Sequence, residues 1–172
     1  GQDLGFPNPG DVAKAVERAL RTCGAVDSLT FSGNGEPTLY PYFAEIAFEV
    51  RRLRDRYCPG ARIALFSNAT TLMHPGVQAA LQHIDRPILK LDAGDAMTLT
   101  QVNRPAAGVN FAGVVEALHG IRDLTLQTVL FDGPVTNASG DAFEAWLRTV
   151  TELKPTQIQI YSTDYPVPDA TI

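Results

Sequence analysis

The chain has 172 residues, of which 45% are hydrophobic and 19% are charged, and its formal net charge is −5. This length suits one domain with its own core, spanning residues 1–172, and the composition argues against a disordered chain. The acidic balance excludes a general attraction to nucleic acid or to anionic membranes. The sequence also has neither an apolar stretch of membrane-spanning length nor a signal-peptide pattern at its start.

Helical and strand patterns alternate along the chain. Apolar residues at helical spacing predict helices at residues 11–24, 42–57, 74–84, 95–103, 110–121 and 142–153. Short apolar runs between them predict strands at residues 25–31, 61–67, 87–93, 124–131 and 156–162. Five strands separated by helices indicate an α/β protein with a parallel sheet. The order fits either a doubly wound sheet or an incomplete β/α barrel, and periodicity does not separate the two.

Polar residues gather where the expected strands end, which is where parallel sheets of either kind bind ligands. Lys90 and Asp92 lie in the third expected strand and share a parity, so their side chains point to the same side. Burying the two groups without partners would be costly. A ligand contact and a structural ion pair both remain open for this pair.

Three other polar segments also allow a structural interpretation. Ser67 and Asn68 either contact a ligand or cap the following helix. Residues 103–105 predict a helix end, although Arg104 could reach an anionic group. Ser139 or Asp141 is expected to cap the last helix.

The turn after the first expected strand, residues 32–39 with the sequence SGNGEPTL, matches neither GxxxxGK[ST] nor GxGxxG. Gly33 and Gly35 would let the backbone expose carbonyl groups and approach a ligand closely. Glu36 adds negative charge to this turn. An amine-bearing ligand therefore fits the turn better than a phosphate.

Four arginines, Arg51, Arg52, Arg54 and Arg56, alternate with acidic and apolar residues. This pattern predicts a solvated helix face rather than a site for nucleic acid.

The cysteines and histidines show no metal-ligand spacing. Cys23 and Cys58 are far apart in the sequence, and we expect them to be reduced thiols in the cytoplasm. His74, His83 and His119 are expected to be structural, and we expect no metal site made within this chain.

The SGNGEPTL turn resembles the Gly-Gly-Glu-Pro region of radical S-adenosylmethionine (SAM) enzymes, which binds the amino group of the cofactor's methionine. Five other segments resemble a bacterial and archaeal branch of this superfamily described as Fe–S oxidoreductases: LFSNATTL, ILKLDAGD, NRPA, LQTVLFDGPVTN and IQIYSTDYPVPD. The resemblance runs from about residue 11 to residue 169. It implies a partial, TIM-like (β/α)6 barrel.

The resemblance also implies site residues. Four of them would contact the amino group of SAM: Gly33, Asn34, Gly35 and Glu36. The others would lie at later strand ends. Ser67 and Asn68 would lie near the ribose or the methionine carboxylate, Lys90 and Asp92 would be cofactor or substrate contacts at the barrel mouth, and Gln127 and Tyr161 would lie toward the adenosine.

The activity that the resemblance implies is reductive cleavage of SAM to a 5′-deoxyadenosyl radical, with a [4Fe–4S] cluster and an electron-donor protein. The substrate is not readable from the sequence. In the family a CxxxCxxC motif after the first strand holds the cluster, and this sequence lacks that motif. We therefore expect the chain to be inactive alone, with neither cluster nor SAM bound to it.

The first expected strand of this chain corresponds to the second strand of the family, and the sequence begins with Gly1. We expect a truncated core whose parent is the enzyme. A cluster-free module that binds SAM or another small molecule, and a purely structural protein, are the alternatives. A missing first strand leaves an unpaired edge, which predicts a homodimer or a cover formed by residues 1–8.

Overall fold

The computed structural model describes residues 5–33 and 35–162. Its helices are α1 (Pro9–Thr22), α2 (Phe43–Tyr57), α3 (Pro75–Leu81), α4 (Ala96–Asn103), α5 (Phe111–His119) and α6 (Gly140–Leu153), with a short 3₁₀ helix η1 (Pro37–Leu39). Its strands are β1 (Ser28–Phe31), β2 (Arg62–Ser67), β3 (Arg86–Lys90), β4 (Thr125–Val129) and β5 (Gln157–Tyr161). Every helix and strand expected from the sequence is present, and most of them are a few residues shorter.

The five strands form one parallel sheet in the order β1-β2-β3-β4-β5. A doubly wound sheet reverses direction at a switch point, whereas a β/α barrel adds its strands in sequence order. The strand order therefore favours the barrel over the doubly wound sheet that periodicity left open, and confirms the partial barrel that the resemblance implied.

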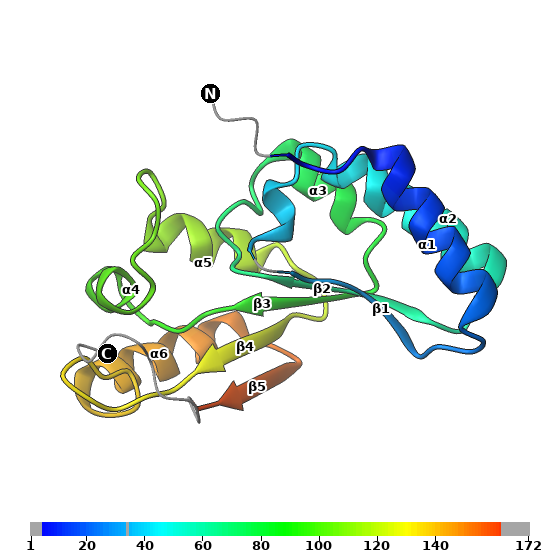
Figure 1. Ribbon diagram of the computed structural model, residues 1–172. Helices are drawn as coiled ribbons and strands as arrows, with labels where there is room; N and C mark the ends of the chain where they lie inside the picture. The colour runs from blue at the N-terminus through cyan, green and yellow to red at the C-terminus, as the bar shows by residue number, and fades with distance from the viewer. Residues whose placement is uncertain (1–4, 34, 163–172) are drawn as a thin grey trace. The chain divides into compact units, whose positions relative to one another are not determined.

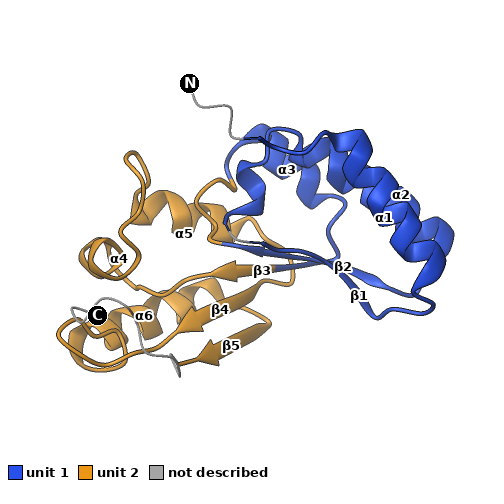
Figure 2. Cartoon of the chain, viewed as in Figure 1, with its two compact units in different colours: residues 1–67, 73–87 blue, residues 68–72, 88–172 orange. Residues whose placement is uncertain are grey.

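The chain divides into two compact units (Figure 2), residues 1–67 with 73–87 (unit 1) and residues 68–72 with 88–172 (unit 2). The single domain expected from the sequence stays a prediction.

The core of unit 1 lies between α2, α3 and β2. Apolar side chains with at most 9% of their surface exposed fill it: Phe43, Ile46, Ala47, Val50, Ile63, Leu65, Ala80 and Ile84. The parallel pair β1–β2 begins at Ser28 opposite Arg62. α1 starts where Asn8 accepts a hydrogen bond from the Gly10 amide, and helix α1 packs beside α2 (Figure 1).

The solvated arginine face predicted on α2 is wrong for Arg54, which is only 5% exposed. Its guanidinium donates to the Ala61 carbonyl and to Asp85, and it also pairs with Asp55. Asp85 in addition accepts from Arg51 and from the Ile63 amide. Asp85, the residue just before β3, lies 31 residues away from Arg54, so local sequence pattern could not indicate this pairing.

Residues 5–8, part of the segment that we considered as a cover for the β1 edge, form no strand. The Pro7 carbonyl accepts from the Tyr40 hydroxyl at 2.7 Å, and the Phe6 ring packs edge-on against Tyr40. The remainder, residues 1–4, lies outside the described residues.

Unit 2 consists mainly of β3, β4 and β5 with α4, α5 and α6. Leu89 and Leu126 are fully buried, and the indole of Trp146 on α6 donates to the Leu91 carbonyl at 3.0 Å. Gly94 lies so close to α6 that a Cβ there would overlap the backbone of Ala145 and Trp146. This close approach fixes the chain just beyond β3 against α6.

None of the helices within the described ranges combines the length and the apolar character needed to cross a bilayer.

Candidate functional site

Lys90 and Asp92 stand at the carboxyl end of β3, in unit 2. The strand ends at Lys90, so Asp92 lies just beyond it rather than within it as expected. The Lys90 ammonium is 3.3 Å from Asp92 Oδ2, and the side chain of Asp92 is fully buried whereas that of Lys90 is 34% exposed. The two side chains therefore do lie together.

Asp92 is satisfied by donors from three other parts of unit 2. Its Oδ1 accepts from the Val129 amide at the end of β4 (2.9 Å), and its Oδ2 accepts from the Asn103 side chain at the end of α4 (2.6 Å). With Lys90 as the third partner, both oxygens of the buried carboxylate have donors within the chain. The structural ion pair, one of the two interpretations of Lys90 and Asp92, is therefore observed. A ligand contact stays a prediction.

Asn137 fixes the backbone around this carboxylate. It has no exposed surface, and its amide nitrogen donates to the carbonyls of Asp92 (2.9 Å) and Val129 (2.7 Å). Its side-chain oxygen accepts from the Phe131 amide at 2.9 Å. One buried amide therefore ties the loop after β4 to the ends of β3 and β4.

Lys90 also contacts β5. Its ammonium donates to the Tyr161 hydroxyl at 3.1 Å and lies 5.8 Å from the centroid of that ring. Burial lowers the pKa of Lys90, but the Asp92 carboxylate and the Tyr161 hydroxyl more than offset this, and the pKa is raised above the usual lysine value. Lys90 is thus a fixed, charged ammonium at the strand ends.

Gln127 belongs to the same group. It is level with Lys90 in the β3–β4 register and with Gln159 in the β4–β5 register. Its amide nitrogen donates to Gln159 Oε1 at 3.4 Å. Of the predicted site residues, the structure brings Lys90, Asp92, Gln127 and Tyr161 together.

The glycine-rich turn belongs to unit 1. Glu36 caps η1, because its Oε1 accepts from the amide (3.2 Å) and the hydroxyl (2.6 Å) of Thr38. Among the described residues, no atom apart from chain neighbours lies within 4 Å of a Cβ built on Gly33 or Gly35. Asn34 lies outside the described residues.

Ser67 is buried at the end of β2. Asn68 Oδ1 accepts from the amide (3.0 Å) and the hydroxyl (2.7 Å) of Thr70 and so closes a turn. The N-cap of α3 is His74, which accepts from the Gly76 amide. The helix-cap alternative is therefore wrong for Ser67 and Asn68, because α3 begins only at Pro75.

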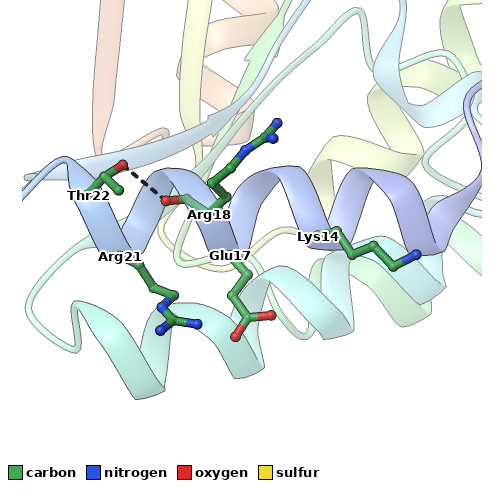
Figure 3. Close-up of a pocket in the computed structure, with 5 residues that line it drawn as sticks. All are labelled: Lys14, Glu17, Arg18, Arg21 and Thr22. Carbon is green, nitrogen blue, oxygen red and sulfur yellow. Dashed lines mark hydrogen bonds between the residues drawn. The ribbon is translucent and has the colours of Figure 1, made fainter.

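Several other features that the sequence singled out can also be located. Residues 103–105 do end a helix, with Arg104 as the left-handed C-cap of α4 at φ 44°. Both cysteines are free, Cys23 being exposed and Cys58 buried. A surface hollow of about 310 Å³ on α1 is lined by Lys14, Glu17, Arg18, Arg21 and Thr22. In Figure 3, Glu17 and Arg21 point to one side of the helix and Arg18 to the other.

Sequence reasoning missed Asn103, Asn137 and Gln159. Asn103 sits within the NRPA segment, where we considered a helix end and an anion contact of Arg104 but no role for Asn103 itself, and Asn137 lies within a loop of turn-forming residues. Gln159 has the same parity as Tyr161 and was the one residue that a periodicity argument could have found.

No family model matches this chain. It is 24% identical over 155 residues to a GTPase Obg of Brachyspira hyodysenteriae, covering 87% of this chain and 22% of that protein. It is 28% identical over 148 residues to a UPF0026 protein of Synechocystis, covering 83% of this chain and 52% of that protein. The chain thus spans about half the length, or less, of these curated relatives.

Two solved structures share the fold. The Streptococcus suis protein SuiB, determined with its precursor peptide SuiA, superposes with a TM-score of 0.62 at 16% identity over 94% of this chain and 34% of SuiB. HemN of Escherichia coli, a coproporphyrinogen III oxidase described as a radical SAM enzyme, gives 0.56 at 16% identity over 90% of this chain and 37% of HemN. The fold is thus an α/β, TIM-like partial barrel of five parallel strands.

Proposed function

We propose that this chain is the SAM-binding core of a cytoplasmic radical SAM enzyme, an oxidoreductase that acts on a small molecule and takes electrons from a donor protein. The glycine-rich turn after β1 carries this proposal. The fold shared with HemN and the order of the strand-end motifs support it.

The turn fits the ammonium group of SAM in two respects. Gly33 and Gly35 leave open space where side chains would stand, and packing among the described residues gives no reason for glycine there. Glu36 is oriented by Thr38 and supplies the negative charge that an ammonium requires. The two glycines and Glu36 all lie within residues 33–36, so the open space and the negative charge are next to each other in the sequence.

The residues present do not fit a [4Fe–4S] cluster. Cys23 follows α1 and is exposed, whereas Cys58 follows α2 and is buried. Within the described ranges no group of three His, Cys, Asp or Glu side chains is arranged to hold a metal. Cluster ligands would have to come from outside the given sequence, and we derive no reaction step from this chain.

Calorimetry with SAM tests the pocket in the chain as it exists. The chain is not expected to retain SAM, because the cluster that supplies much of the attachment of SAM in the family is missing from it. At millimolar SAM, however, we expect saturable heat with the wild type. Binding should be about tenfold weaker for Glu36→Gln, the loss expected for one charge-assisted contact. Gly33→Val, which fills the open space, is expected to weaken binding at least as much. Glu144→Gln, a change at an exposed position on α6, serves as the control and should bind like the wild type. Equal affinities of the wild type and Glu36→Gln would contradict the assignment.

The coding sequence upstream of Gly1 tests the enzyme itself. A strand pattern ending in CxxxCxxC would support a radical enzyme whose cluster loop precedes this core. A start codon close to Gly1 without that motif would favour the second candidate, a cluster-free small-molecule-binding module, which the missing motif in the present sequence supports.

A further inference from the structure

A row of polar side chains crosses β3, β4 and β5 on one face of the sheet in unit 2. Lys90, Gln127 and Gln159 are consecutive partners in the register of the three strands. Tyr161 lies two residues beyond Gln159 on β5 and so points to the same side. We call these four residues the polar row.

The polar row differs from the residues around it. One step back toward the strand starts, the same face carries Ile88 and Thr125 on β3 and β4, both about 5% exposed, and the exposed Gln157 on β5. The members of the row are instead half-buried or, for Tyr161, 41% exposed. β3 and β4 thus change from closed packing to accessible polar groups at their carboxyl ends, and β5 is accessible at both levels.

Hydrogen-bonding capacity remains unused along the row. The Lys90 ammonium has three N–H groups and two partners in the described chain, Asp92 and Tyr161. The Gln127 carbonyl oxygen and the Gln159 amide nitrogen have no partner among the described residues, and Tyr161 accepts from Lys90 while its own proton stays available. The row therefore presents mainly donors, with one fixed positive charge.

The ion pair with Asp92 leaves the Lys90 ammonium available to a ligand. Its carboxylate is fully buried behind Lys90, and the Val129 amide and the Asn103 side chain already donate to it. It orients the ammonium and is shielded from a ligand on the exposed side. Lys90 is the charged group of this site that a ligand can reach.

We propose that the polar row binds the anionic group, a carboxylate or a phosphate, of a small polar ligand. The ammonium of Lys90 and the hydroxyl of Tyr161 donate to the anion, and the two glutamines contact the adjoining part of the ligand. Binding of the anion is argued from unit 2 alone. The assignment of that ligand as the enzyme's substrate rests on the proposed function.

The test uses lysine labelled with ¹³C, because the chain has only three lysines, Lys14, Lys90 and Lys154. The wild type is titrated with sodium phosphate, and separately with sodium malonate, at constant ionic strength while the ε-methylene NMR signals are followed. We expect a saturable shift at Lys90 that Lys14 and Lys154 do not show. No shift at Lys90, or equal shifts at all three lysines, would overturn the proposal.

Variants separate the row from general folding effects. Tyr161→Phe removes one hydroxyl from an accessible side chain and should weaken phosphate binding about tenfold. Lys90→Met should abolish the heat of phosphate binding in calorimetry, whereas Lys14→Met, on α1, should not change it. A Tyr161→Phe chain that binds phosphate like the wild type would count against the row even if Lys90→Met failed to fold.

Repeating the phosphate titration with SAM present distinguishes the source of the anion. Displacement of phosphate by SAM would make the anion the cofactor's carboxylate and would overturn the substrate assignment. A Lys90 shift that persists with SAM bound would support a separate substrate. Phosphate binding without any SAM binding would support the row as an anion site and would count against an intact SAM pocket in this chain.

Discussion

At the residue scale, two fully buried polar side chains organise the end of β3. Asp92 collects donors from β3, β4 and α4, and Asn137 closes the surrounding backbone with three hydrogen bonds. Buried polar groups stabilise a single arrangement only when all their partners are present. The position of the Lys90 ammonium is therefore determined by residues up to 71 positions away in the chain.

The pKa of Lys90 is expected to fall when Asp92 is replaced by asparagine, because burial remains while the opposing charge is removed. A pH titration of the lysine ε-methylene NMR signals measures this directly. In the wild type Lys90 should titrate above the usual value of 10.5. A Lys90 pKa unchanged in Asp92→Asn would contradict the pairing.

The same shift has a consequence for stability. A raised folded-state pKa contributes stability that is present below the unfolded-state value and is lost as the pH rises through the folded value. The free energy of unfolding of the wild type should therefore decrease above about pH 10.5 more steeply than that of Asp92→Asn. Urea unfolding across this range provides the measurement.

Asp85 forms ion pairs with two arginines, Arg51 and Arg54. It is the strongest candidate in unit 1 for a group whose protonation in acid lowers the stability. Burial raises its pKa, but the Ile63 amide, Arg54 and Arg51 outweigh burial and lower it below 3.8. This contribution is present above pH 3.8 and is lost as the pH falls through the lower folded-state value.

Asp85→Asn should lower the free energy of unfolding at neutral pH by about 2–3 kcal/mol, because it leaves the buried Arg54 short of a charged partner. Asp55→Asn, at a carboxylate with 56% exposure, should cost less than about 1 kcal/mol. Urea unfolding of both variants compares them, and equal losses would show that Asp85 is an ordinary surface acid.

At the element scale, side-chain caps set where most helices begin. Asn8, His74, Asp95 and Asn110 each accept from a backbone amide in the first turn of α1, α3, α4 and α5. Ser139 occupies the N-cap position of α6, as expected, but its side chain accepts no hydrogen bond from the first turn.

Asp95→Ala is expected to cost about 1–2 kcal/mol, because Asp95 accepts from both the amide and the hydroxyl of the buried Thr98. Ser139→Ala should cost less than about 0.5 kcal/mol, since the cap bond is absent. Thermal unfolding of the two variants decides this, and a larger loss for Ser139→Ala would refute the cap assignment.

Gly94 is required by packing between elements. Gly94→Ala should destabilise the protein by about 2–4 kcal/mol, because the new methyl group would meet the rigid backbone of α6 at Ala145 and Trp146. Gly60→Ala, where a Cβ meets nothing within 4 Å, should change the stability by less than about 0.5 kcal/mol. Urea midpoints would contradict this if both variants matched the wild type.

At the scale of the whole molecule, the outer strands of the sheet differ from the inner ones. β1 and β5 come first and last in the strand order, and their residues are largely exposed, whereas those of β2 and β4 are mostly buried. Ile158 and Ile160 on β5 are 38% and 56% exposed. β2 and β4 therefore have buried residues on both faces.

The β1 edge leads us to expect a dimer, since an unpaired parallel strand invites pairing with a second chain. Sedimentation equilibrium of the wild type should show a concentration-dependent dimer. Ser28→Lys, which adds a charge on β1, should shift it to the monomer, whereas Gln78→Lys on the exposed side of α3 should not. A wild type that stays monomeric at every concentration would exclude this interface.

Local patterns in the sequence determined the helices, the strands and the position of Lys90 and Asp92 on the same side of the chain, because these depend on residue spacing within one element. Tertiary structure alone decided the strand order, the burial of Arg54 against Asp85 and the approach of Gly94 to α6. It also decided that Asn103 and Asn137 complete the surroundings of Asp92. These features join residues that are between 11 and 55 positions apart. Such contacts depend on how the elements pack, and no local periodicity encodes them.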